Sequence, residues 1–274
     1  MLDAWLSRNA AYQQQPGFAV AIVHDQEVLY AKGFGYANLE KQIPFTENTI
    51  TRIGSQSKQF TSIAIMQLQE EGKLSIDDPV AKHLPGLLVS NPTGADTTIT
   101  IKQLLAHTAG LRSDGTLNYY WTELDFTTDD ELNQEIRSIR LVSDPSTKKK
   151  YSNLGYALAG RVVQNVSGMP FRDYVQTKIV TPLGMDATFF NEIPAPVSDG
   201  LATGYGRRLP DGSRNEIQRW NANAMTSAFG MHSTLNDLIR FVKWQMKLAK
   251  STDSFLVSPA TIREMRRAHW NDPD

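Results

Sequence analysis

Ser55 and Lys58 stand three residues apart at the start of the run "RIGSQSKQFTSIAIMQLQEEGKL", residues 52 to 74. A serine hydroxyl is a weak nucleophile and needs a base, and residues three apart on a helix share a face. A lysine serves as that base only where burial or a neighbouring cation lowers its pKa. The free N–H groups at a helix start also favour a developing oxyanion. The pattern predicts a nucleophilic serine, provided that Lys58 is enclosed.

The same short patterns occur twice, so the tetrapeptides alone do not decide the site. Ser146 and Lys149 repeat the serine–lysine spacing in a polar, proline-containing loop, and Tyr36-Ala37-Asn38 repeats the form of Tyr151-Ser152-Asn153. By spacing alone, Ser55 is more typical of a surface or helix-capping serine. The context that follows separates the candidates.

Composition excludes several classes of function. The chain has no cysteine, which rules out thiol catalysis and cysteine–metal sites, and its five histidines lack metal-ligand spacing. No Gly-x-Ser-x-Gly elbow is present, which argues against an α/β-hydrolase. The 28 basic and 29 acidic side chains are interspersed, so we expect no nucleic-acid partner.

No window is long and apolar enough for a membrane span, so we expect a soluble chain without one. The compartment is open: periplasmic or secreted if a signal peptide was removed, and otherwise cytoplasmic.

The elements expected to position these residues indicate an α+β organisation. Residues 2–13 have helical spacing, 18–34 read as an antiparallel hairpin joined by "HDQE", and the chain turns mostly helical from residue 56. Helix-start signals follow at Thr100, at Thr128 with Glu131, at Thr234 with Asp237, and at Ser258-Pro259. The stretch "LGYALAGRVVQNVSG" is apolar on most sides, which predicts a buried helix.

Five blocks carry a resemblance to a known family. They are "GYANLEKQIPFTENTITRIGSQSKQFTSIAIMQLQEEGKLSIDDPVAKHLP", "ITIKQLLAHTAGL", "YSNLGYALAGRVVQNVSG", "PLGM" and "HSTLNDLIRF". In this order they resemble the serine β-lactamase-like superfamily, in the class C-related branch of penicillin-binding proteins, D-stereospecific peptidases and amidases, and family VIII esterases. The resemblance implies an antiparallel sheet flanked by helices plus a largely helical region. It also implies a division into a sheet-associated part, 1–56 with 230–274, and a helical part, 57–229.

The resemblance also assigns roles to residues. It makes Ser55 the acylated nucleophile, Lys58 its partner, and Tyr151 the phenol that relays the proton and later orients the deacylating water. Asn153 matches the position that hydrogen-bonds the substrate and Lys58. Whether Lys58 or Tyr151 is the base stays open, because their titrations are coupled. The implied cycle forms and hydrolyses an acyl-enzyme with no metal or organic cofactor.

The chain departs from the family in its third motif. No Lys-x-Gly or His-x-Gly occurs in the 274 residues, so we expect C-terminal strands to be lacking and a companion C-terminal segment to carry that motif. Phe229 replaces a usual glycine, either to reshape the pocket rim or merely to pack. Tyr119, Tyr120, Trp121 and Trp220 either line an apolar acyl pocket or pack ordinarily.

Three functional hypotheses remain. The first is a serine hydrolase that cleaves an ester, an amide or a D-amino-acid peptide bond of a small-molecule or peptide substrate through acylated Ser55. The second is a class C-like β-lactamase or penicillin-binding DD-peptidase, which uses the same residues. The third is a catalytically silent scaffold or binding homologue. The complete Ser55, Lys58, Tyr151 and Asn153 set favours the first.

Overall fold

The structure is a computed structural model that describes residues 1–114, 124–190 and 200–271. Contacts divide the chain into two compact units. The sheet unit comprises Met1–Arg52, Leu183–Trp220 and His232–Lys247. The helical unit comprises Ile53–Pro182, Asn221–Met231 and Leu248–Asp274. The sequence placed 230–274 with the sheet, whereas the contacts group Leu248 onward with the helices; the predicted division into domains itself stays a prediction.

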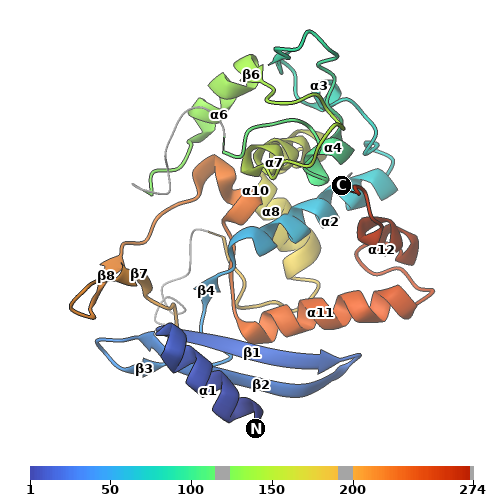
Figure 1. The fold of residues 1–274 in the computed structure, drawn as a ribbon. Coiled ribbons are helices and arrows are strands. Elements are labelled where there is room, and N and C mark those ends of the chain that lie inside the picture. The colour runs from blue at the N-terminus through green and yellow to red at the C-terminus, as the bar shows by residue number, and fades with distance from the viewer. Residues whose placement is uncertain (115–123, 191–199, 272–274) are drawn as a thin grey trace. The chain divides into compact units, whose positions relative to one another are not determined.

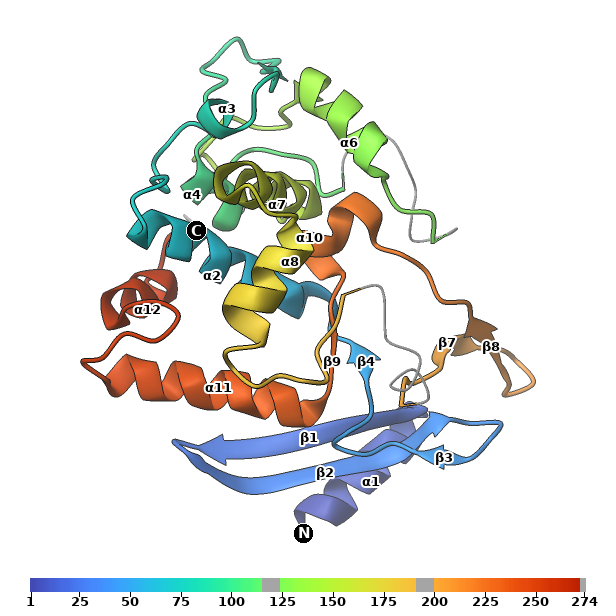
Figure 2. The same cartoon turned by 180° about the vertical axis from the view of Figure 1, so that it is seen from behind.

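The sheet unit begins with a helix and a hairpin, as predicted. Helix α1 (Leu2–Gln13) precedes β1 (Gly17–His24) and β2 (Glu27–Asn38), which pair antiparallel. Strand β3 (Ile43–Pro44) adds to β2, giving the order β1-β2-β3. In Figures 1 and 2, α1 lies against one face of this sheet. The tight turn at Asp25, which has a φ of 54°, follows from the polar "HDQE" segment.

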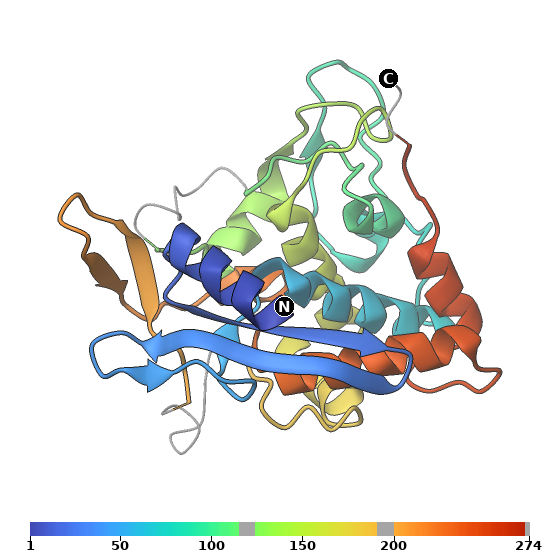
Figure 3. The ribbon, with the colours of Figure 1, turned by 60° about the horizontal axis from the view of Figure 1, so that its bottom comes forward.

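Two short strand pairs and a long helix complete the sheet unit. Strand β4 (Thr51–Arg52) pairs with β9 (His232–Ser233), and β7 (Gly204–Arg208) pairs with β8 (Arg214–Ile217). Helix α11 (Leu235–Lys250) begins where the Thr234 hydroxyl accepts the Asp237 backbone N–H, at the predicted start. Figure 3 shows α11 running beside the hairpin, where the Gln26 amide donates to the carbonyl of Lys243.

The helical unit is built around α2 (Ser57–Glu70), α7 (Asn153–Ser167) and α10 (Thr226–Phe229), which pack on one another (Figure 2). The other elements are α3 (Val80–His83), α4 (Ile101–Leu105), α6 (Asp129–Glu135), α8 (Phe171–Val175), α12 (Pro259–Arg266), the short helices Gly54–Gln56, Ile136–Ser138, Gln176–Val180 and Asn223–Met225, and the parallel pair β5 (Val89–Ser90) and β6 (Ile139–Arg140). The "LGYALAGRVVQNVSG" helix is buried along most of its length, as predicted.

Side-chain caps fix where these helices start. Thr100 and Thr128 each form a capping box, and the Ser258 hydroxyl accepts the backbone N–H of Thr261 ahead of α12. Each hydroxyl satisfies an N–H group that would otherwise lack a partner at the helix end.

The helices and the antiparallel sheet confirm the α+β class predicted from the sequence. Among the described residues, no helix is long and apolar enough to cross a membrane.

Candidate active site

Ser55 lies in a single turn, Gly54–Gln56, directly before α2. The turn starts at Gly54, whose φ of 54° is in the left-handed region that glycine adopts without strain. The buried Ser57 hydroxyl donates to the Gly54 carbonyl at 2.7 Å and accepts the Met231 N–H at 3.1 Å. The Ile53 N–H donates to the Met231 carbonyl at 3.0 Å. These bonds hold the turn in place, so that Ser55 lies directly before the N-terminus of α2.

The Ser55 hydroxyl contacts two of the predicted partners at once. Its Oγ lies 2.6 Å from the phenol oxygen of Tyr151 and 3.2 Å from Nζ of Lys58. Tyr151 directly precedes the capped start of α7 and is 44% exposed, and Ser55 is also exposed. An incoming substrate can therefore reach the oxygen that the two partners hold.

Lys58 is enclosed, which was the condition for its chemistry. It is 6% exposed, and its Nζ donates to Oδ1 of Asn153 at 2.7 Å and to the carbonyl of Ala228 at 2.8 Å. Burial lowers the pKa of Lys58 to about 8, while the charge of Asp114 acts to raise that pKa. A lysine in this range exchanges its proton near neutral pH, which an exposed lysine does not do.

Asn153 stands at the first residue of α7, and both ends of its amide are engaged. Oδ1 accepts from Lys58, and Nδ2 donates to Oδ1 of Asp114 at 2.5 Å. The side chain is buried. Because an amide nitrogen carries two hydrogens, one donor is left for a substrate. Its predicted binding to Lys58 is present, and its contact with substrate stays a prediction.

His107 forms the wall behind Tyr151. Its ring centroid lies 4.5 Å from that of Tyr151 and 5.2 Å from that of Tyr156. Nδ1 accepts the backbone N–H of Ser152 at 3.1 Å, so the neutral ring carries its proton on Nε2. Burial, with the charges of Lys58 and Lys149, lowers the pKa of His107 to about 4. A neutral imidazole therefore packs against the phenol.

The competing patterns do not assemble a similar site. Ser146 Oγ accepts from the Gln103 amide at 2.8 Å in an exposed loop, and Lys149 is exposed, so neither has the enclosure seen at Ser55 and Lys58. Asn38 of the other Tyr-x-Asn pattern donates to Thr203 in the sheet unit. Context, not spacing, distinguishes Ser55 and Tyr151.

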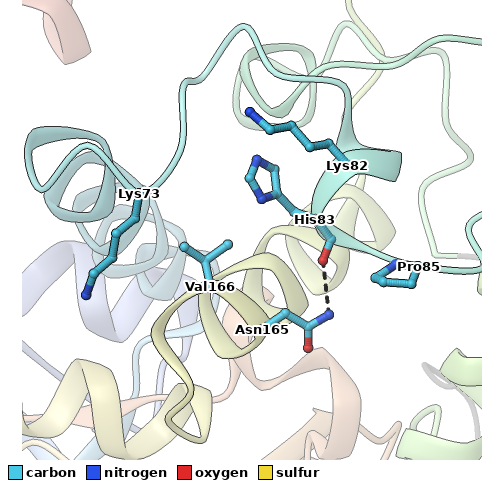
Figure 4. A pocket seen from close by; sticks show the side chains of 6 residues that line it. All are labelled: Lys73, Lys82, His83, Pro85, Asn165 and Val166. Carbon is cyan, nitrogen blue, oxygen red and sulfur yellow. Dashed lines mark hydrogen bonds between the residues drawn. The ribbon is translucent and has the colours of Figure 1, made fainter.

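A pocket of about 610 Å³ lies elsewhere in the helical unit (Figure 4). Its lining residues are Lys73, Lys82, His83, Pro85, Asn165 and Val166. Lys73 pairs with Glu71, and Asp78 binds both Lys82 and His83. Both lysines are already paired with carboxylates, and none of the predicted site residues lines this pocket. No group of side chains among the described residues is arranged to hold a metal ion.

The structure describes two of the aromatic residues whose roles the sequence left open, Phe229 and Trp220. Phe229 is 3% exposed and its ring lies 5.3 Å from that of Phe126, so it packs and does not form a rim. The Arg52 guanidinium stacks 3.5 Å from the Trp220 ring in the sheet unit. Tyr119, Tyr120 and Trp121 lie outside the described residues.

Several neighbours of the site were not found from the sequence. Asn153 binds Asp114, and Lys58 binds the carbonyl of Ala228 and lies over the ring of Tyr156. Ser57 holds the turn that carries Ser55. The only available signal was that Asp114 is the third residue after the "AHTAGL" block and that Ser57 lies inside the serine–lysine motif. Neither position has a spacing that indicates chemistry.

The chain is similar to several known proteins. The family model described as Beta-lactamase matches residues 2–272. Protein flp of Staphylococcus aureus (strain COL) is 35% identical over 250 residues, which cover 89% of this chain and 48% of that protein. Teichoic acid D-alanine hydrolase of S. aureus is 34% identical over 190 residues, covering 68% of this chain and 44% of that protein. The chain thus spans about half the length of the curated relatives it matches.

A solved structure shares the fold. The octameric penicillin-binding protein homologue from Pyrococcus abyssi superposes with a TM-score of 0.84 at 30% identity, covering 99% of this chain and 60% of that one.

Proposed function

Because the chain belongs to the Beta-lactamase family, we propose that it is a serine hydrolase that acts through an acyl-enzyme on Ser55. The bond cleaved is an ester, an amide or a D-amino-acid peptide bond. The membership in the serine β-lactamase-like superfamily predicted from the sequence is confirmed, whereas the residue roles and the bond type belong to the proposal.

One observation carries the proposal: the Ser55 hydroxyl touches both an enclosed lysine amine and a phenol. As Ser55 Oγ attacks the substrate carbonyl carbon, its proton passes to whichever of Lys58 and Tyr151 is deprotonated. That proton then protonates the leaving group as its bond to the acyl carbon breaks. Water, deprotonated by the same pair, hydrolyses the acyl-serine and returns the proton to Ser55.

Stabilisation of the oxyanion falls in part to the backbone N–H of Ser55, at the start of α2. A second donor belongs, in this proposal, to a companion segment bearing the Lys-x-Gly or His-x-Gly motif, which these 274 residues lack. Loss of one oxyanion donor costs about a hundredfold or more in rate.

The substrate proposed first is a D-alanyl ester of a polyol polymer. The support is the name of one relative, Teichoic acid D-alanine hydrolase, at 34% identity. Such an ester has a small acyl group, and its alkoxide leaving group takes the proton that Lys58 or Tyr151 removed from the exposed Ser55. With this substrate we propose a location outside the cytoplasm, supported by the name of that relative alone.

A second candidate, penicillin binding or hydrolysis, is favoured by the likeness to a penicillin-binding protein homologue. It uses the same residues and differs in which acyl group forms and how fast water removes it. A fluorescent penicillin and a D-alanyl ester therefore belong in one experiment.

The test is intact mass spectrometry after incubation with a fluorophosphonate, a fluorescent penicillin or a D-alanyl ester. We expect one adduct on Ser55 with the fluorophosphonate, none in Ser55→Ala, a severe reduction in Tyr151→Phe, and full labelling in Ser146→Ala. Inactivation by Ser146→Ala, or no label on the wild-type protein, would refute the assignment. A stable penicillin adduct with no ester turnover would favour the second candidate.

A further inference from the structure

The Asn153 amide is shared between a cation and an anion. Its Oδ1 accepts from Nζ of Lys58 at 2.7 Å, and its Nδ2 donates to Oδ1 of Asp114 at 2.5 Å. An ammonium only donates and a carboxylate only accepts, so the two partners allow a single orientation of the amide. Asp114 thereby fixes the atom that Lys58 binds, although it does not itself contact the ammonium by a hydrogen bond.

Among the described residues, few charged groups act on Lys58. The rings of Tyr151 and Tyr156 face its Nζ at 4.8 and 5.4 Å, and the Ala228 carbonyl accepts from it. His107 stands behind both rings and is held neutral.

A more distant cation, Lys149, helps to lower the pKa of His107. Among the groups that shift the pKa of Lys58, Asp114 supplies the negative charge that opposes the effect of burial. Removing that carboxylate therefore leaves burial unopposed.

We infer that Asp114 is a positioning residue of the acyl-transfer site, which orients Asn153 and sets the pH at which Lys58 exchanges its proton. The inference rests on the proposed function and deepens it, because it states which group controls the base.

The sign of the effect follows from the charge. Replacing Asp114 by asparagine removes a negative charge that favours the ammonium, so Lys58 loses its proton at lower pH. If neutral Lys58 is the base, the rising limb of the rate moves to lower pH. If the Lys58 ammonium assists a Tyr151 phenolate, the alkaline fall moves to lower pH instead. The limb that moves thus identifies the base.

The experiment follows the Lys58 Cε resonance in protein carrying ¹³C-lysine, assigned with Lys58→Met, from pH 6 to 10. The same samples give the rate of fluorophosphonate labelling of Ser55 at each pH. In Asp114→Asn we expect the Lys58 midpoint and one limb of the labelling rate to fall together by roughly one pH unit. Asp114→Glu, which retains the charge, should stay near wild type. Asp253→Asn, at an exposed loop position, is the matched control.

Unchanged midpoints in Asp114→Asn, or a uniform loss of labelling at every pH, would overturn the inference. Asp114→Ser is the second variant should Asp114→Asn not fold, with the same expected shift. A wild-type protein that takes no label refutes the proposed function, while the Lys58 resonance still tests the role of Asp114. The two failures are therefore distinguishable.

Discussion

The ring of His107 lies against the ring of Tyr151, with centroids 4.5 Å apart and planes inclined by 32°. The same imidazole accepts the backbone N–H of Ser152, the residue that follows Tyr151. His107 also has a φ of 61°, a left-handed conformation that asparagine and histidine tolerate better than most residues. One side chain therefore controls both the position of the phenol and the start of α7.

This arrangement predicts different outcomes for two substitutions of His107. Asparagine at position 107 keeps an acceptor for the Ser152 N–H and tolerates the left-handed backbone conformation. For His107→Asn we therefore expect about a tenfold loss in the rate of Ser55 labelling, from the missing ring contact with Tyr151 alone. His107→Ala loses the acceptor as well and leaves a buried N–H unpaired, which costs about 1–3 kcal/mol of stability. Labelling rates and urea denaturation of both variants check this. Equal effects of the two substitutions would contradict the role of Nδ1.

A second prediction concerns stability in acid. Burial lowers the pKa of His107 from 6.5 to about 4, so between these values the unfolded chain binds a proton that the folded chain does not. The neutral imidazole of His107 therefore makes its full contribution to the free energy of unfolding above pH 6.5. That contribution is lost as the pH falls toward 4. We expect this histidine to account for roughly 1–2 kcal/mol, since its imidazole is only partly shielded.

Urea denaturation at pH 7 and at pH 4.5 measures it. His107→Asn should reduce the difference between the two pH values, and His24→Asn, at an exposed position, should leave it as in the wild type. An unreduced difference in His107→Asn would show that other groups set the acid sensitivity.

A third prediction separates activity from stability at Lys58. Lys58→Met keeps an unbranched side chain one atom shorter and removes the buried amine, so the protein is relieved of the desolvation that lowers the pKa of Lys58 to about 8. It also leaves Oδ1 of Asn153 and the Ala228 carbonyl without this donor. These effects oppose each other, and we expect a net change within about 2 kcal/mol.

Labelling of Ser55 should nevertheless fall by about a thousandfold or more, because the Lys58–Tyr151 pair that takes the Ser55 proton loses one member, whichever of the two is the base. Thermal denaturation and labelling rates are compared with Lys178→Met, at an exposed position. A variant that unfolds, or one that labels at the wild-type rate, would contradict this division.

The local signals in the sequence predicted several elements of the fold. Helical spacing predicted the helix at 2–13, and two β-rich runs joined by "HDQE" predicted the hairpin at 18–34, because both signals depend on residues close in the chain. The burial of Lys58 was posed as a condition, and the structure meets it. Ser55, Lys58, Tyr151 and Asn153 came from motif order, and the structure brings them within hydrogen-bonding contact.

Contacts within the helical unit between residues far apart in the chain could not be predicted from the sequence. Asp114 meets Asn153 across 39 positions, and the Ala228 carbonyl meets Lys58 across 170. A backbone carbonyl has no signature in the residue type, and a loop aspartate is typical of a solvated turn. The packing of α10 against α2 and α7 brings the Ala228 carbonyl to Lys58.

The packing of α10 against α7 leads to the last prediction. A Cβ built on Gly160 would lie 2.5 Å from Ser227 Oγ and 2.6 Å from Ser227 Cβ, whereas a Cβ on Gly155 meets its nearest atom at 3.5 Å. Both glycines lie inside α7, where alanine is favoured over glycine by about 1 kcal/mol. We therefore expect Gly155→Ala to be neutral or stabilising by up to about 1 kcal/mol.

Gly160→Ala should instead destabilise by roughly 1–3 kcal/mol, because overpacking pushes α10 away. Since Ala228 follows Ser227 and its carbonyl holds Lys58, the same substitution should also slow labelling of Ser55, and Gly155→Ala should not. Urea denaturation and labelling rates of the two variants provide the comparison. Equal stability of the two would mean that α10 shifts freely, and the bond between Lys58 and Ala228 would then not be a fixed part of the site.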